Sequence, residues 1–123
     1  MEIVNCCPHA LHYHHEDGTI EDFEPCGIVI RAIEVKTPTK ALPEHETYTI
    51  KYLIDETCLP KPSETPQAWV VSNIAAAVLY GKVPENVTLL YPGDLVRNDK
   101  GMIIGCKGFV EYRGTEIGGV TSI

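Results

Sequence analysis

The sequence lacks the residue spacings by which common metal and phosphate sites are recognised. It has five cysteines and five histidines, but no Cys-x-x-Cys pair and no His-Glu-x-x-His segment. It also has no Gly-x-Gly-x-x-Gly run, no Walker loop ending in Gly-Lys-Ser/Thr and no Gly-x-Ser-x-Gly elbow. These absences argue against the usual zinc enzymes, P-loop enzymes, dinucleotide-binding enzymes and serine hydrolases.

Long hydrophobic runs are missing as well. No apolar stretch approaches the roughly 20 residues that cross a bilayer. Residues 1–5 lack the basic region and the apolar core of a secretory signal. The odd number of cysteines then indicates reduced thiols, mostly buried. We expect a protein without a membrane partner, in the cytoplasm.

Positive charge is scarce in the first half of the chain. Residues 1–64 carry twelve acidic and five basic side chains, a net charge of −7, whereas residues 65–123 carry five of each. Long nucleic acid is bound by neutralising many phosphates in series, so an acidic chain disfavours it as a partner. A small anion needs only a local positive site, which we expect in the neutral half.

What the sequence does contain is a series of short β-type segments divided by turn residues. A length of 123 residues suits one domain, so we expect a single β-rich ligand-binding domain over residues 1–123. The Glu-Asp-Gly of residues 16–18 predicts a hairpin turn, and three prolines in residues 59–66 exclude a helix or a central strand there. The main strands are expected at residues 2–7, 11–15, 19–23, 28–35, 46–55, 87–91, 102–106 and 109–113.

Two of these segments carry expectations about burial. Residues 28–35 are rich in β-branched side chains and predict a buried strand. Residues 46–55 alternate between apolar and polar side chains, which predicts a half-buried strand. We expect an α+β fold that is predominantly β, either a small sandwich or a curled antiparallel sheet with one short buried helix.

Residues 69–81 predict a strand that runs directly into this helix. Ser72 or Asn73 stands where an N-terminal cap belongs, and Gly81 stands where the helix should stop. Because such a junction directs backbone N–H groups toward one place, it suits an anion. The helix is apolar nearly all round, which indicates cover from the sheet and from a second subunit.

Five residues are candidates for a nucleotide site. Asn73 lies at the helix start. Trp69 either presents its aromatic face to a ligand or packs in the core. Arg97 and Lys100 belong to a turn where they either bind phosphate or face solvent. Arg113 ends the last strand, where a symmetric partner could use it.

The histidines and cysteines near the N-terminus allow two other interpretations. One is a zinc site and the other is a Cys–His nucleophile, and neither has a recognisable spacing in its favour. The alternative to both is a solvated hairpin beside a carboxylate-rich turn. The residues concerned are His9, His12, His14, His15, Cys6, Cys7 and Cys26.

Several segments resemble a known group of small phage and prophage proteins. Residues 4–10, Val-Asn-Cys-Cys-Pro-His-Ala, are similar to the Asn-Leu-Thr-Pro-His-Ala start of that group, with Cys-Cys in place of Leu-Thr. Residues 71–73 and 95–109 resemble further segments of it, whereas residues 30–65 carry little of the resemblance. Within the group, the chain resembles the Thoeris anti-defence family, type one.

This resemblance implies a binding protein rather than an enzyme, without cofactor or metal. Members of the family sequester the cyclic ADP-ribose isomer made by a bacterial TIR immune sensor and leave it uncleaved. They assemble as homodimers or higher homo-oligomers with the ligand at a subunit interface, and some also bind cyclic oligonucleotides. The resemblance implies adenine stacking and arginine–diphosphate pairing, which we assign to Arg97 and then to Asn73, Lys100, Trp69 and Arg113.

Two alternatives stay open at this stage. One is a small hydrolase of a nucleotide signal that uses the histidines and cysteines. The other is an interaction protein without a small ligand, whose proline segment and C-terminal glycines, Gly118 and Gly119, serve as docking arms.

Overall fold

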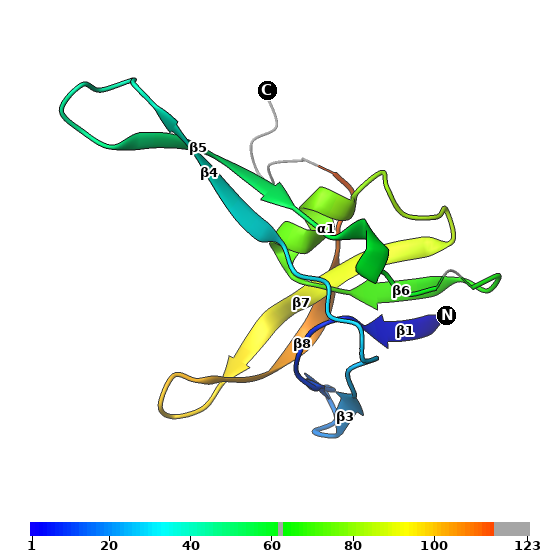
Figure 1. Ribbon diagram of the computed structural model, residues 1–123. Helices are drawn as coiled ribbons and strands as arrows, with labels where there is room; N and C mark the ends of the chain where they lie inside the picture. The colour runs from blue at the N-terminus through cyan, green and yellow to red at the C-terminus, as the bar shows by residue number, and fades with distance from the viewer. Residues whose placement is uncertain (62, 115–123) are drawn as a thin grey trace, which may run out of the picture.

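The computed structural model describes residues 1–61 and 63–114 (Figure 1). Gly118 and Gly119 lie outside the described residues. The elements are β1 (Glu2–Asn5), β2 (Leu11–His14), β3 (Ile20–Phe23), β4 (Ile33–Thr39), β5 (Thr47–Leu53), the 3₁₀-helix η1 (Glu56–Cys58), β6 (Gln67–Val70), α1 (Asn73–Leu79), β7 (Val87–Arg97) and β8 (Ile103–Glu111).

Six strands form one sheet in the order β1-β6-β7-β8-β2-β3, and β4 and β5 form a separate two-stranded sheet. The predominantly β, α+β class is therefore confirmed. β7–β8 and β2–β3 are antiparallel, whereas β1–β6, β6–β7 and the single β2–β8 bridge are parallel. β6 and β7 run parallel because the chain between them crosses back through α1.

The caps that the sequence predicts delimit α1. The hydroxyl of Ser72 accepts a hydrogen bond from the Ala75 N–H at 3.1 Å, and Gly81 follows the helix with a φ of +81°. Ala75, Ala76 and Leu79 are buried in the main core, where they pack with Trp69, Val71 and Leu89 among others. Ile74 keeps 39 % of its surface exposed, so one chain does not cover this helix on every side.

β4 and β5 form a hairpin, the β4–β5 arm, that extends away from the large sheet (Figure 1). Every residue of β4 is exposed, and β4 overlaps the predicted buried strand of residues 28–35 only at residues 33–35. Ile30 is buried in the core as expected, but it lies before the strand, so the prediction is wrong in the bounds of the strand and in its burial. β5 does form within residues 46–55, but only Thr47 and Tyr52 are partly buried. The arm leaves Ile33, Val35, Tyr48, Ile50 and Leu53 exposed.

β7 continues through Pro92 and Gly93, beyond residue 91, where the sequence predicts that this strand ends. Within this strand, Asp94 has a φ of +47°, in the left-handed region, and the pairing register with β8 shifts further along, between Val96 and Arg97. Only glycine occupies that region without a penalty from its Cβ, although aspartate tolerates it better than most residues.

Replacing Asp94 by glycine is therefore expected to stabilise the protein by about 0.5–1 kcal/mol, after allowance for the greater backbone entropy of glycine. Urea unfolding of the two proteins measures the change. Asp99→Gly is the matched control, because Asp99 is an exposed aspartate of the next turn without a positive φ. A lower midpoint for Asp94→Gly would show that the aspartate side chain itself stabilises the fold.

Candidate ligand-binding site

Trp69 is a core residue. Its side chain is 1 % exposed, and its indole N–H donates to the Gln67 side-chain oxygen at 3.3 Å. β6 lies between β1 and β7, with Val4 and Leu89 beside Trp69 in register. This burial corrects the expectation that Trp69 stacks on a ligand, because its ring is not available from solvent in this chain.

Asn73 is the first residue of α1 and is exposed. Its side-chain oxygen accepts a hydrogen bond from the Ile74 N–H at 2.8 Å, while Ser72 acts as the N-cap. The amide of Asn73 therefore reaches solvent beside the helix start.

Arg97 and Lys100 lie at the tip of the β7–β8 hairpin. The Arg97 guanidinium donates to the Gly101 carbonyl at 2.8 Å. The side-chain oxygen of Asn98 accepts from the N–H groups of Lys100 and Met102 at 2.9 and 3.0 Å. The side chains of Arg97 and Asn98 therefore stabilise the exposed turn in which they lie.

Arg113 lies beyond the opposite end of the same hairpin. Its guanidinium donates to the Glu111 carboxylate at 2.9 Å, and Glu111 pairs with Leu90 in register. The strand from Leu90 to Arg97 advances roughly 23 Å at about 3.3 Å per residue. Arg97 and Arg113 therefore cannot contact one small ligand within a single chain.

The structure instead gathers a different set of residues around a cavity of about 330 Å³, which we call the Arg31 pocket. Four chain segments that are distant in sequence meet there. The lining residues are Cys7, Pro8, Ile30, Arg31, Ala32, Tyr52, Ser72 and Ile74.

Arg31 is the cationic group of this pocket. It is exposed, and among the described residues its guanidinium makes no hydrogen bond or ion pair. A guanidinium is planar, always charged and suited to phosphate. Tyr52 lines the same cavity with a half-buried ring, and its hydroxyl donates to Glu34 at 3.4 Å. A cation and an aromatic ring on the lining of one cavity are a combination that suits a nucleotide.

Sequence reasoning did not select Arg31 and Tyr52. One signal was available, because Arg31 is the only basic residue in the otherwise acidic residues 1–35. Tyr52 gave no signal of its own, since it belongs to the alternating pattern of a strand. The predicted strand-to-helix junction does contribute to this pocket, through Ser72 and Ile74.

Cys7 is the only cysteine that lines the Arg31 pocket, and burial raises the pKa of its thiol, with Cys26 nearby adding to the shift. Burial also raises the pKa of Cys6 and Cys106. A thiol needs a lowered pKa to act as a nucleophile at neutral pH. These three cysteines therefore suit packing better than covalent catalysis.

Two histidines of β2 and its flanks pair with carboxylates. His12 Nδ1 lies 2.6 Å from the Asp22 carboxylate, and His15 Nε2 lies 3.0 Å from Glu21. Among residues 1–61 and 63–114, no three histidine, cysteine, aspartate or glutamate side chains are placed to hold a metal ion. This arrangement is that of a hairpin beside acidic residues, which the sequence left open as an alternative.

In the part of the chain that the structure describes, no helix is long and apolar enough to cross a membrane. The chain has no significant match among protein-family models, curated proteins or solved structures.

Proposed function

We propose that this chain is a phage or prophage anti-defence protein that binds a small cyclic nucleotide and sequesters it without cleavage. The ligand is a cyclic ADP-ribose isomer made by a TIR immune sensor in the cytoplasm of the bacterial host. The observation that carries the proposal is the Arg31 pocket, where an arginine and a tyrosine ring line one cavity. The resemblance of residues 4–10, 71–73 and 95–109 to the Thoeris anti-defence family supplies the identity of the ligand.

The size of the pocket favours a ligand shared between two copies of the chain. Small-molecule pockets measure about 300–1,000 Å³, and the Arg31 pocket lies at the lower end of that range. A diphosphate that is removed from water needs several charge-assisted partners, and one arginine supplies only part of them. A second copy would provide more cations and would cover exposed apolar residues of the pocket, such as Ile74.

Replacing Arg31 by alanine is expected to weaken binding of the cyclic nucleotide by roughly 10–100-fold, because a charge-assisted contact contributes about 1.5–3 kcal/mol. Isothermal titration calorimetry on the purified protein measures the loss. Arg31→Lys keeps the charge but not the planar fork, so its affinity should fall between the two. Arg97→Ala is the matched control, because the Arg97 side chain bonds its own turn.

Mass spectrometry of the bound molecule and binding measurements on the variants separate this proposal from its rivals. Protein purified from cells with an active TIR enzyme should release an intact cyclic nucleotide on heating, detected by mass spectrometry. Release of a cleaved product would support a hydrolase. If Arg31→Ala binds like the natural chain while Arg97→Ala does not, the ligand lies at the hairpin tip instead. If no nucleotide binds, the chain is an interaction protein.

The hydrolase alternative retains one observation in its favour. A histidine oriented by a carboxylate is the arrangement of a general base, and His12 and Asp22 form such a pair at 2.6 Å. The raised pKa values of Cys7 and Cys106 speak against a thiolate nucleophile. Turnover of the nucleotide that is lost in His12→Phe would support this alternative.

A further inference from the structure

A second cavity, larger than the Arg31 pocket, lies between the start of β2 and the β7–β8 hairpin. Its volume is about 570 Å³, well within the range of small-molecule sites. We call it the histidine pocket. Its lining consists of His9, Ala10, Leu11, His12, Pro92, Leu95, Ile103, Ile104, Gly105 and Cys106, none of which lines the Arg31 pocket.

Aliphatic side chains make up much of this lining. Leu95, Ile103 and Ile104 are 46, 54 and 42 % exposed, although large apolar side chains are more stable away from water. All three line the same concave surface. An apolar molecule that fills the cavity would remove this surface from water, so the body of the ligand should be hydrocarbon or aromatic.

Gly105 lets the two walls of the cavity come together. A Cβ placed on this residue would lie 2.5 Å from the His12 carbonyl oxygen and from the His14 ring. β8 can therefore approach β2 closely enough to pair Cys106 with Tyr13. This close approach places His12 beside the aliphatic side chains of the hairpin.

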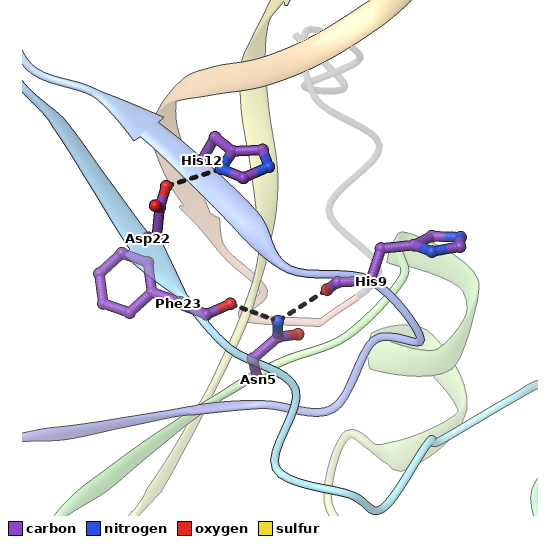
Figure 2. Close-up of polar contacts among 5 residues, drawn as sticks. All are labelled: Asn5, His9, His12, Asp22 and Phe23. Atoms are coloured by element: carbon purple, nitrogen blue, oxygen red, sulfur yellow. Dashed lines mark hydrogen bonds and ion pairs between the residues drawn. The ribbon is translucent and has the colours of Figure 1, made fainter.

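His12 gives the pocket its polar group. The Asp22 carboxylate accepts a hydrogen bond, so the ring nitrogen Nδ1, 2.6 Å away, carries the hydrogen. In the neutral ring, Nε2 is then an acceptor. Figure 2 shows this second nitrogen on the side of the ring away from Asp22, and the His9 imidazole extends to the same side.

Asn5 fixes the segment that carries both histidines. Its buried side-chain amide donates to the carbonyls of His9 and Phe23, each at 2.9 Å (Figure 2). These bonds tie the chain before β2 to the end of β3. The acceptor on His12 is therefore presented by a rigid support, which favours specific binding.

We propose that the histidine pocket binds a small aromatic alcohol of the phenol class, with its ring against Leu95, Ile103 and Ile104 and its hydroxyl donating to His12 Nε2. An O–H donor matches the free acceptor, and the ring matches the apolar walls. The carboxylate of Asp22 beside His12 disfavours an anionic ligand. This site is independent of the nucleotide function proposed above.

The test uses the full chain and a matched pair of probes, 4-ethylphenol and 4-ethylanisole. They share the same apolar body, but only the phenol can donate a hydrogen bond. We expect 4-ethylphenol to shift the methyl NMR signals of Leu95, Ile103 and Ile104 with saturation. We expect 4-ethylanisole to bind about 5–10-fold more weakly, the effect of one neutral hydrogen bond.

Variants then assign the donor preference to one imidazole. His12→Phe should bind both probes equally, because it retains an apolar wall and removes the acceptor. His15→Phe is the matched control, since His15 also pairs with a carboxylate of the same hairpin but does not line this pocket. It should retain the preference for the phenol.

The comparison of the two probes on the unmodified chain keeps the test valid if His12→Phe does not fold. Equal affinity for both probes would overturn the proposal, as would saturable shifts confined to residues outside the pocket. The absence of binding by either probe would overturn it as well.

Discussion

Substitution of Asn5 by alanine is expected to lower the free energy of unfolding by about 3–5 kcal/mol. The Asn5 side chain is 2 % exposed and makes three hydrogen bonds. Its amide donates to the carbonyls of His9 and Phe23, and its oxygen accepts from the Cys7 N–H at 2.9 Å. Alanine would leave these partly buried backbone groups without their side-chain partner, and an unpaired group costs about 1–3 kcal/mol where water does not replace that partner.

Chemical denaturation of the two proteins under identical conditions measures the loss. Asn98→Ala is the matched control, because Asn98 also bonds two backbone N–H groups but does so in an exposed turn. We expect it to cost less than about 1 kcal/mol, since water replaces the lost partner. Asn5→Asp should be as damaging as alanine at neutral pH, because a carboxylate cannot donate to two carbonyls. Equal stability of Asn5→Ala and Asn98→Ala would contradict this account.

Asn5 also accounts for the local conformation of residues 4–10. Its side-chain amide donates to the carbonyl of His9, four positions along the chain, so this bond fixes the segment that leads into β2. The asparagine and the residue it bonds therefore act together as a folding element.

Local interactions were predictable from the sequence. The hairpin turn forms around Asp17, whose carboxylate accepts hydrogen bonds from the N–H and the hydroxyl of Thr19. These bonds hold the pKa of Asp17 below its usual value. The cap at Ser72 and the stop at Gly81 are equally local. In each case, residues within a few positions of one another decide the conformation.

The burial of β5 could not be predicted in the same way. The alternation of Tyr48, Ile50 and Tyr52 indicates a strand with one apolar face, and the strand is present. Tyr48 and Ile50 are nevertheless each 46 % exposed, and Tyr48 is covered only in part, by the Lys36 ammonium 4.7 Å from its ring centroid. A periodic pattern identifies an apolar face but not the surface that covers it. A two-stranded hairpin is marginally stable alone, so a surface that covers this face would stabilise the arm.

The candidate site was harder to predict than the fold. Cys7, Arg31, Tyr52 and Ser72 line one cavity although they come from four separate segments. The spacing of these residues in the sequence does not show that they come together, because this depends on where the β4–β5 arm joins the rest of the protein. The sequence predicts Arg97 and Lys100 in one turn and leaves open whether they bind phosphate or face solvent. In the structure, the side chain of Arg97 and the N–H of Lys100 bond groups of that turn.

Replacing Trp69 by alanine is expected to cost about 3–5 kcal/mol, the usual range for a large aromatic residue in a core. Trp69 is the largest fully buried side chain, and β6 carries it between β1 and β7. A domain of this size has a total stability of about 5–15 kcal/mol. The loss is therefore a large part of the total, and thermal unfolding followed by far-UV circular dichroism should show it.

The control and the ligand measurement together separate a core role from a stacking role. Tyr80→Ala removes an aromatic ring that is 51 % exposed, so its cost should be below about 1 kcal/mol. Trp69→Phe should retain much of the stability. Because Trp69 is buried and does not line the Arg31 pocket, this variant should keep its nucleotide affinity at temperatures where it is folded. If Trp69→Phe is stable but loses affinity, the ring contacts the ligand in a conformation that opens the core, and the Arg31 pocket is only part of the site.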